Sequence, residues 1–249
     1  MSKKVTYLCI GVQKGGTSSL RNYMNQHPEI YMLEKEGRFF DSLEPNSKNI
    51  IEYEKRFLAD GKTIIGEKTP CYCYLPYAID RIYNYNPNMK LIIILREPVS
   101  RAYSQFNMKF SKRLTSFFPD ILKEKDVKLQ DIRANDGGRY IIVRGFYDEQ
   151  LEYIFSKFGR SQIYVGISEE IKQNKNIEYN NMFKFLGANT EIIVDETQDC
   201  HFGKYKKPID LADARALYEI YKPHNERLYL LLGRKIDSWE AYYKTLGLN

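Results

Sequence analysis

A glycine-rich segment near the N-terminus contains the residue types that bind phosphate. Residues 11–18 read GVQKGGTS and join a β-rich stretch to an expected helix that begins near Thr17 or Ser18. Unobstructed backbone N–H groups and the positive end of a helix dipole form an anion site in such a turn. The segment is therefore predicted to hold a phosphate group, with Lys14 inside the loop. A glycine turn without any ligand is the alternative interpretation.

The same loop lacks residues that a nucleotide kinase or a GTPase requires. Its glycine spacing is that of a Walker A loop, but Thr17 stands after Gly16, where the Walker lysine belongs. The aliphatic run 90–95 ends in Arg96, where a Walker B strand would supply an aspartate for magnesium. We therefore expect phosphate binding without the magnesium-dependent apparatus of those enzymes.

Arg96 and Ser104 form a second candidate phosphate site. They are eight residues apart, at the end of an expected strand and in the second turn of the helix that follows. This layout directs a guanidinium and a hydroxyl toward one phosphate, and arginine suits a bidentate contact. A salt bridge on the helix surface is the alternative interpretation of Arg96.

The hydrophobic pattern places both candidate segments at one edge of a sheet. Strands are expected at 5–10, 30–33, 62–66, 90–95 and 162–167. Besides the helix after the glycine loop, helices are expected at 98–110, 145–158, 178–187 and 211–232. Alternating strands and helices predict an α/β fold with a parallel sheet covered on both faces. Ligands bind beyond the carboxyl ends of such strands, where 11–19 and 96–104 fall.

Length and composition favour one globular domain over 1–249. The chain has 249 residues, 43% of them hydrophobic and 28% charged, with a formal net charge of +6. This balance favours anionic partners, but no dense run of lysine and arginine indicates nucleic acid. No apolar stretch is long enough for a membrane span or a signal peptide, so a cytoplasmic location is expected.

Cysteine and histidine spacing predicts no metal site. Only one C-x-C pair is present, so the cysteines are expected to be buried free thiols: Cys9, Cys71, Cys73 and Cys200. The histidines share no metal-ligand spacing and are expected to be structural: His27, His201 and His224.

Six segments in order along the chain resemble sulfotransferases that depend on 3′-phosphoadenosine 5′-phosphosulfate (PAPS), especially the branch with the heparan sulfate sulfotransferases. Residues 14–20 resemble the 5′-phosphosulfate loop, and 35–41 (KEGRFFD) resemble K-E-x-H-F-F-D. The others are 67–70 (EKTP), 96–104 (REPVSRAYS, like R-D-P-x-x-R-x-x-S), 144–147 (RGFY) and the tail 223–239. The resemblance implies the sulfotransferase fold, a P-loop-like central parallel β-sheet flanked by helices. It also implies PAPS as donor, PAP as product and no metal.

The resemblance implies a role for each matching residue. Lys14 would lie beside the 5′-phosphate and the bridging oxygen, and Lys68 would assist at the transferred group. The loop residues that would hold the 5′-phosphate are Gly15, Gly16, Thr17, Ser18 and Ser19. The residues that would hold the remainder of the nucleotide, its 3′-phosphate above all, are Arg96, Ser104, Arg144 and Tyr147.

Glu36 is the predicted general base, a role in which a positioned carboxylate contributes about 10²–10⁴-fold. Glu34 competes by proximity, and an exposed loop carboxylate is the alternative. The family often has a histidine two residues after this glutamate, but this chain has Arg38, so a histidine base is not supported. Arg38 is expected to contact an anionic acceptor or the sulfuryl oxygens.

Two further segments are expected to contribute to the site, the first by closing over the nucleotide and the second at the acceptor. Residues 203–208 (GKYKKP) resemble the family's lysine–glycine loop in altered order, and Lys204 is the predicted nucleotide contact, with the lysines up to 207 left open. Only Cys200 is present nearby, so no disulfide is expected there. Segment 109–144 has nine basic and five acidic residues, a net charge of +4. It is expected to form part of an acceptor cleft through Arg133 and Arg139, with a solvated helical insert as the equal alternative.

The chain is thus predicted to be a PAPS-dependent sulfotransferase that uses direct in-line transfer to a hydroxyl or an amine. A glycan acceptor is expected, and a small metabolite or a carrier-tethered acceptor fits almost as well. The alternatives are a nucleotide kinase with an unusual loop and a non-catalytic nucleotide-binding protein.

Overall fold

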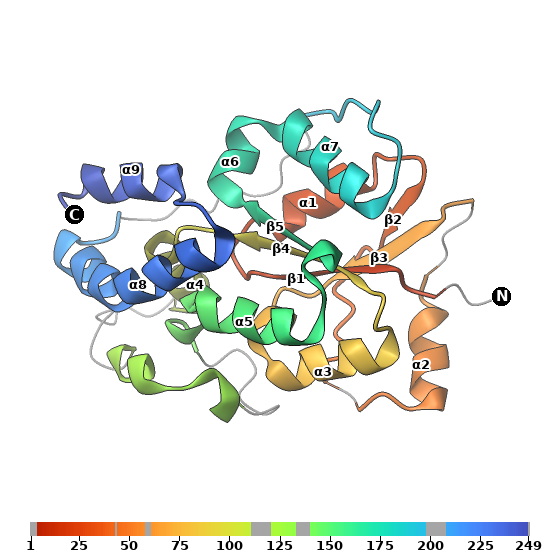
Figure 1. The fold of residues 1–249 in the computed structure, drawn as a ribbon, viewed down its shortest axis with the longest axis horizontal. Coiled ribbons are helices and arrows are strands. Elements are labelled where there is room, and N and C mark those ends of the chain that lie inside the picture. The colour runs from red at the N-terminus through yellow and green to blue at the C-terminus, as the bar shows by residue number, and fades with distance from the viewer. Residues whose placement is uncertain are drawn as a thin grey trace.

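A five-stranded parallel sheet forms the centre of the protein (Figure 1). The structure, a computed structural model, describes residues 4–42, 44–57, 61–110, 121–132, 140–197 and 208–248. The strands are β1 (Tyr7–Gly11), β2 (Ile30–Met32), β3 (Ile64–Lys68), β4 (Lys90–Leu95) and β5 (Ile163–Ile167), in the spatial order β2-β3-β1-β4-β5. All four neighbouring pairs are parallel. The α/β fold with a central parallel sheet is therefore confirmed.

Helices cover both faces of this sheet. In Figure 1, α1 (Thr17–Met24), α6 (Ser168–Gln173) and α7 (Lys175–Leu186) lie on one face. On the other side are α2 (Ser47–Glu54), α3 (Pro76–Tyr85), α4 (Pro98–Phe110), α5 (Tyr147–Lys157) and α8 (Leu211–Leu232). The helix α9 (Asp237–Thr245) follows α8 at the C-terminal end. Short 3₁₀ turns occur at Tyr72–Tyr74 (η1), Leu122–Asp126 (η2), Leu129–Asp131 (η3), Val143–Gly145 (η5) and Arg160–Gln162 (η6).

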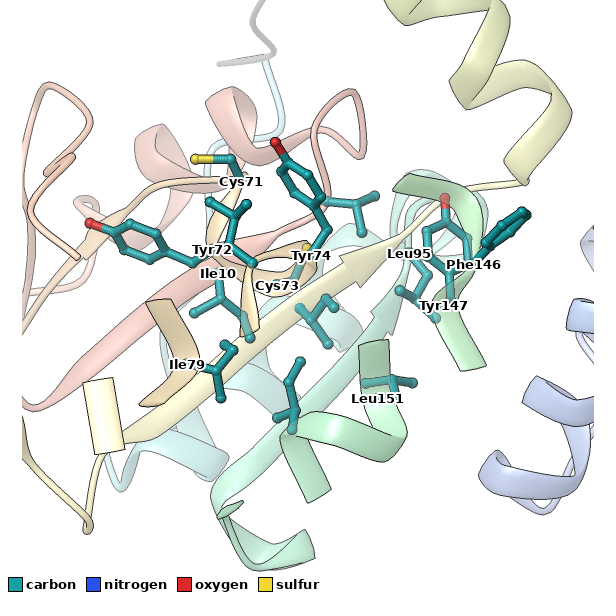
Figure 2. Close-up of a cluster of buried hydrophobic side chains, with 14 of the residues drawn as sticks. Ile10, Cys71, Tyr72, Cys73, Tyr74, Ile79, Leu95, Phe146, Tyr147 and Leu151 are labelled. Atoms are coloured by element: carbon teal, nitrogen blue, oxygen red, sulfur yellow. The ribbon is translucent and has the colours of Figure 1, made fainter. Parts of the chain in front are cut away.

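The core has two parts because each central strand is buried on both faces. Along β4, Leu91, Ile93 and Leu95 face one cluster, while Ile92 and Ile94 face the other. Figure 2 shows the first cluster, in which Ile10 and Leu95 from the sheet lie close to Ile79 of α3 and Leu151 of α5. Burial on both faces explains why β4 is a continuous aliphatic run instead of an alternating one.

The cysteines in the described part of the chain agree with expectation. Cys9, Cys71 and Cys73 are buried free thiols, whereas Cys200 lies outside the described residues. Among the described residues, no group of three or more His, Cys, Asp or Glu side chains is arranged to hold a metal ion. Within the same ranges, every helix is too short or too polar to cross a lipid bilayer.

Candidate active site

A cavity of about 410 Å³ lies at the edge of the sheet where β1, β3, β4 and β5 end. Parallel strands bring their carboxyl ends to this one edge, so residues distant in sequence meet there. The cavity wall includes ten of the predicted site residues: Lys14, Gly15, Gly16, Thr17, Ser18, Ser19, Glu36, Lys68, Arg96 and Ser104. Among the described residues, the lining carries five basic side chains, Lys14, Lys68, Arg96, Lys172 and Lys175, and one carboxylate, Glu36. The cavity therefore favours an anionic ligand.

The glycine loop is shaped by close contacts with β4. A Cβ on Gly15 would lie only 2.5 Å from the carbonyl oxygen of Ile94, so a side chain is excluded there. Gly16 has a φ of 96°, a left-handed conformation that favours glycine, and it precedes the first turn of α1. That turn contains no acidic residue, and the first N–H groups of an α-helix have no carbonyl of the preceding turn to bond to. The loop thus presents the positive end of α1 to the cavity.

Lys14 contacts Arg96 and Met108 on the cavity wall. Its backbone is left-handed, with a φ of 73°, and its carbonyl accepts a hydrogen bond of 3.1 Å from Arg96 Nη1. Its ammonium lies 3.9 Å from Met108 Sδ, a side chain that is half exposed at the cavity. Lys14 and Arg96 are therefore held next to each other on the cavity wall.

The turn from β4 into α4 is fixed by a buried carboxylate. Glu97 accepts hydrogen bonds from the backbone N–H groups of Val99 (2.8 Å) and Ser100 (2.6 Å), and so caps the first turn of α4. Tyr243 of α9 donates to the same carboxylate at 2.9 Å. Burial raises the pKa of Glu97, although these hydrogen bonds oppose the shift. The Glu97 backbone N–H in turn donates to Glu169 at 3.2 Å.

The two arginines of the Arg96–Ser104 segment occupy different environments. Arg96 lines the cavity, as does Ser104, which is almost completely buried. Arg101 is fully buried away from it and donates to Gln105 (2.6 Å) and to the carbonyl of Ile141. Arg101 thus holds the chain before α5, while Arg96 faces the ligand space.

Glu36 and Lys68 reach the cavity from the β2 and β3 sides. The Glu36 side chain is 40% exposed, and its Oε2 lies 3.7 Å from Arg38 Nη1. Arg38 itself has a φ of 53°, pairs with Asp41 at 2.7 Å and does not line the cavity. Lys68 is mostly buried at the last position of β3. Glu34, the competing carboxylate, is exposed and is not part of the cavity wall.

Arg144 and Tyr147 lie one layer behind the cavity wall. Arg144 is 4% exposed, donates to Gln13 Oε1 (2.7 Å) and to the Tyr74 hydroxyl (2.8 Å), and stacks over the Tyr74 ring. Tyr147 donates to the carbonyl of Arg96 at 2.8 Å. They contact lining residues, so their predicted contact with the nucleotide stays a prediction. Arg133, Arg139 and Lys204 lie outside the described residues.

One wall of the cavity was not predicted from the sequence. It is formed by residues of α1, α6 and α7, namely Tyr23, Ser168, Ile171, Lys172, Lys175 and Tyr179. The Tyr23 and Tyr179 rings are 4.5 Å apart, and Lys175 Nζ lies 5.8 Å from the Tyr23 ring centre. These residues belong to no recognisable motif. Only Tyr23 could have been inferred from the sequence, because it lies one helical turn after Ser19 and so on the same face of the expected helix.

Comparison with known proteins identifies related sequences. A family model described as "Sulfotransferase domain" matches residues 6–226. Heparan sulfate glucosamine 3-O-sulfotransferase 5 of Mus musculus is 27% identical over 256 residues, which cover 92% of this chain and 72% of the mouse protein. The human heparan sulfate glucosamine 3-O-sulfotransferase 3A1 is 28% identical over 264 residues, covering 94% of this chain and 62% of its own length.

Solved structures with the same fold are also found. A sulfotransferase from Alicyclobacillus acidocaldarius superposes with a TM-score of 0.75 at 25% identity, covering 95% of this chain and 99% of that one. Sulfotransferase STF9 from Mycobacterium avium has a TM-score of 0.54 at 10% identity, covering 91% of this chain and 77% of its own, and shares the fold.

Proposed function

This chain belongs to the sulfotransferase domain family and is a PAPS-dependent sulfotransferase, and we propose that it sulfates an acidic glycan, with Glu36 as the general base. The mouse and human relatives are named for the glucosamine of heparan sulfate, and heparan sulfate is an anionic glycan. The observation that carries the proposal is the single cavity that joins the glycine loop, Arg96, Lys68 and Glu36.

The lining divides into regions that suit the parts of PAPS. The glycine loop and Lys14 would hold the 5′-phosphosulfate, and Arg96 with Ser104 would hold the 3′-phosphate. The wall formed by Tyr23, Ile171 and Tyr179 offers a flat and apolar surface to the adenine ring of PAPS. When PAPS is bound, it supplies an activated sulfuryl group whose leaving group is a phosphate.

Each polar side chain then has one task in the transfer. Glu36 accepts the proton of the acceptor hydroxyl or amine while that oxygen or nitrogen forms a bond to sulfur. The bond between sulfur and the bridging oxygen breaks, and the electron pair stays on the departing 5′-phosphate. Lys14 and Lys68 offset the charge that develops there, in the way that fixed cations stabilise phosphoryl transfer.

The nucleotide-kinase and non-catalytic alternatives are not favoured by the family match. The lining basic residues support an anionic donor, and the proposed glycan acceptor rests on the named relatives. The expected cytoplasmic location stays a prediction.

Calorimetric titration with PAP, without metal, tests the donor half of the proposal. Wild type is expected to bind PAP in the micromolar range and to bind ATP with magnesium far more weakly, and Arg96→Ala is expected to bind PAP about 10- to 100-fold more weakly than wild type. Tighter binding of ATP with magnesium would overturn the assignment of the cavity to PAPS.

Transfer of ³⁵S from labelled PAPS tests the acceptor half. Heparan sulfate and chondroitin are expected to accept label, whereas neutral dextran and small phenols are not. Transfer to phenols with none to the glycans would replace the glycan with a small metabolite.

A further inference from the structure

A buried carboxylate lies directly beneath the segment that carries Glu36. Glu67, the residue before Lys68 in β3, is fully buried. Its Oε2 accepts hydrogen bonds from Gly37 N (3.0 Å) and Thr69 Oγ1 (2.8 Å). Its Oε1 accepts from the hydroxyls of Tyr72 (3.0 Å) and Tyr53 (3.5 Å). We call Glu67, Thr69, Tyr72 and Tyr53 the Glu67 cluster.

The Glu67 cluster satisfies four successive backbone N–H groups after Glu36. The first, Gly37 N, bonds to the carboxylate itself. The second, Arg38 N, donates to Thr69 Oγ1 at 3.1 Å. The Tyr72 hydroxyl accepts the third and fourth, from Phe39 (3.0 Å) and Phe40 (3.3 Å). The Thr69 and Tyr72 hydroxyls in turn donate hydrogen bonds to Glu67, so they link these backbone N–H groups to the carboxylate.

The contact depends on the absence of a side chain at position 37. A Cβ on Gly37 would lie 2.3 Å from Glu67 Cδ, well inside van der Waals contact. In addition, Arg56 donates to the carbonyls of Gly37 (2.6 Å) and Glu36 (3.2 Å). The backbone that carries Glu36 is thus held on its N–H side by the Glu67 cluster and on its carbonyl side by Arg56.

From this geometry we propose that Glu67 is a positioning residue that sets the place of Glu36 relative to the acceptor. The proposal rests on the proposed function, in which Glu36 is the base. Glu67 does not line the cavity, and the described nucleotide-side residues, the glycine loop and Arg96, are fixed by other contacts. A defect at Glu67 should therefore change the rate of transfer and leave the affinity for PAP intact.

The ionised form of Glu67 suits the Glu67 cluster because its four described hydrogen-bond partners all donate to it. A protonated carboxyl of Glu67 would carry an O–H group that faces other hydrogen-bond donors. One of the hydrogen bonds between the Glu67 cluster and the segment after Glu36 would then be lost. Burial raises the pKa of Glu67 to about 7, with the hydrogen bonds from Thr69, Gly37 and Tyr72 opposing that rise. The other titratable groups that face it are Tyr7 and Cys9 of β1, Tyr53 of α2, Tyr72 of η1 and Arg56.

Glu67→Gln tests the proposal because it keeps the volume and places an amide N–H₂ against the donors. We expect kcat to fall by about 10- to 100-fold while the Kd for PAP, measured by calorimetry, changes less than about threefold. Glu97→Gln is the matched control, since Glu97 is equally buried but caps α4 beside Arg96. There the PAP affinity is expected to fall. A loss of PAP affinity in Glu67→Gln as large as its loss of kcat would overturn the proposal.

The pH profile separates positioning from general destabilisation. Wild-type kcat is expected to rise about tenfold from pH 6 to pH 8 as Glu67 ionises, and this rise should disappear in Glu67→Gln. If kcat of Glu67→Gln rose with pH as it does in wild type, ionisation of Glu67 would not cause the rise, and this result would count against the proposal.

Hydrogen exchange of the amides at 37–40 gives a readout that needs no acceptor. Faster exchange there in Glu67→Gln, with the glycine loop unchanged, is expected. Gly37→Ala, which disturbs the same contact from the loop side, should reproduce it if the first variant fails to fold. Unchanged exchange in both variants would refute the proposal. If wild type transfers sulfate to no acceptor, the proposed function fails, and exchange at 37–40 still decides the role of Glu67.

Discussion

Among single residues, Glu36 offers the clearest test, since it is the one carboxylate in the described lining. Glu36→Gln is expected to lower kcat by about 10²–10⁴-fold, because the amide does not accept the acceptor proton. Calorimetry should give the same PAP affinity as wild type, since the base acts on the acceptor. Glu34→Gln is the control and should leave both quantities unchanged. A larger loss in Glu34→Gln would move the base to Glu34.

Arg96 and Arg101 provide a second test at this scale. They are five positions apart, and Arg96 lines the cavity whereas Arg101 is buried and bonds to the chain before α5. Arg101→Ala leaves Gln105 and the Ile141 carbonyl without their partner, so the unfolding free energy should fall by about 1–3 kcal/mol. Arg96→Ala should instead weaken PAP binding by about 10- to 100-fold with little change in urea unfolding. The assignment is wrong if the two variants exchange these phenotypes.

Sequence motifs predicted ten of the residues that line the cavity, but neither the wall from α6 and α7 nor the burial of the predicted residues. Glu36, Lys14 and Arg96 were identified because their neighbours form recognisable segments. The predicted contact of Arg144 with the nucleotide stays a prediction. In the structure its guanidinium is buried against Gln13 and the Tyr74 ring, whereas Arg96 lines the cavity. Such a difference depends on packing between segments far apart in the chain, which residue spacing does not encode.

Among the elements, α9 contacts the turn before α4 directly through Tyr243, and indirectly through Trp239 and Glu169 of α6. Trp239 Nε1 donates to Glu169 at 3.0 Å, and the Tyr243 hydroxyl donates to Glu97 at 2.9 Å. Tyr243→Phe should lower the unfolding free energy by about 1–3 kcal/mol, since the buried Glu97 loses a donor. Urea unfolding measures this, with the partly exposed Tyr83→Phe as the comparison. Equal effects of the two substitutions would show that the Glu97 contact does not stabilise α9.

Strands were predicted better than helices, for physical reasons. The run that forms β4 is aliphatic throughout because both of its faces are buried, and its bounds match the prediction. β3 ends two residues later than expected, since Glu67 and Lys68 are strand residues in spite of their charge. The expected helices did not include α2, α3, α6 or α9. Tyr53 is the one buried residue of α2, and α6 has only six residues, so neither of these two shows a helical period.

For the whole molecule, burial of Glu67 predicts a pH dependence of stability. Its pKa is raised from 4.5 to about 7 in the folded protein, so the folded state binds more protons between these values. Its contribution is therefore fully present below about pH 4.5 and is lost as the pH rises through 7. Relative to Glu67→Gln, wild type should lose up to about 3 kcal/mol of unfolding free energy between pH 4 and pH 8. Urea unfolding at both pH values measures this, and a constant difference between the proteins would contradict it.

The basic lining of the cavity has a consequence for turnover. The proposed contacts of the glycine loop, Arg96 and Ser104 are all to phosphates that stay on the nucleotide after the sulfuryl group has left. PAP thus keeps nearly all of the proposed contacts that bind PAPS. PAP should act as a competitive inhibitor against PAPS, with an inhibition constant no larger than the KM for PAPS, and its departure should limit the steady-state rate. A phosphatase that removes the 3′-phosphate of PAP should then accelerate multiple turnovers without changing the first one, so the speed of this protein in a cell depends on how quickly its surroundings clear that nucleotide.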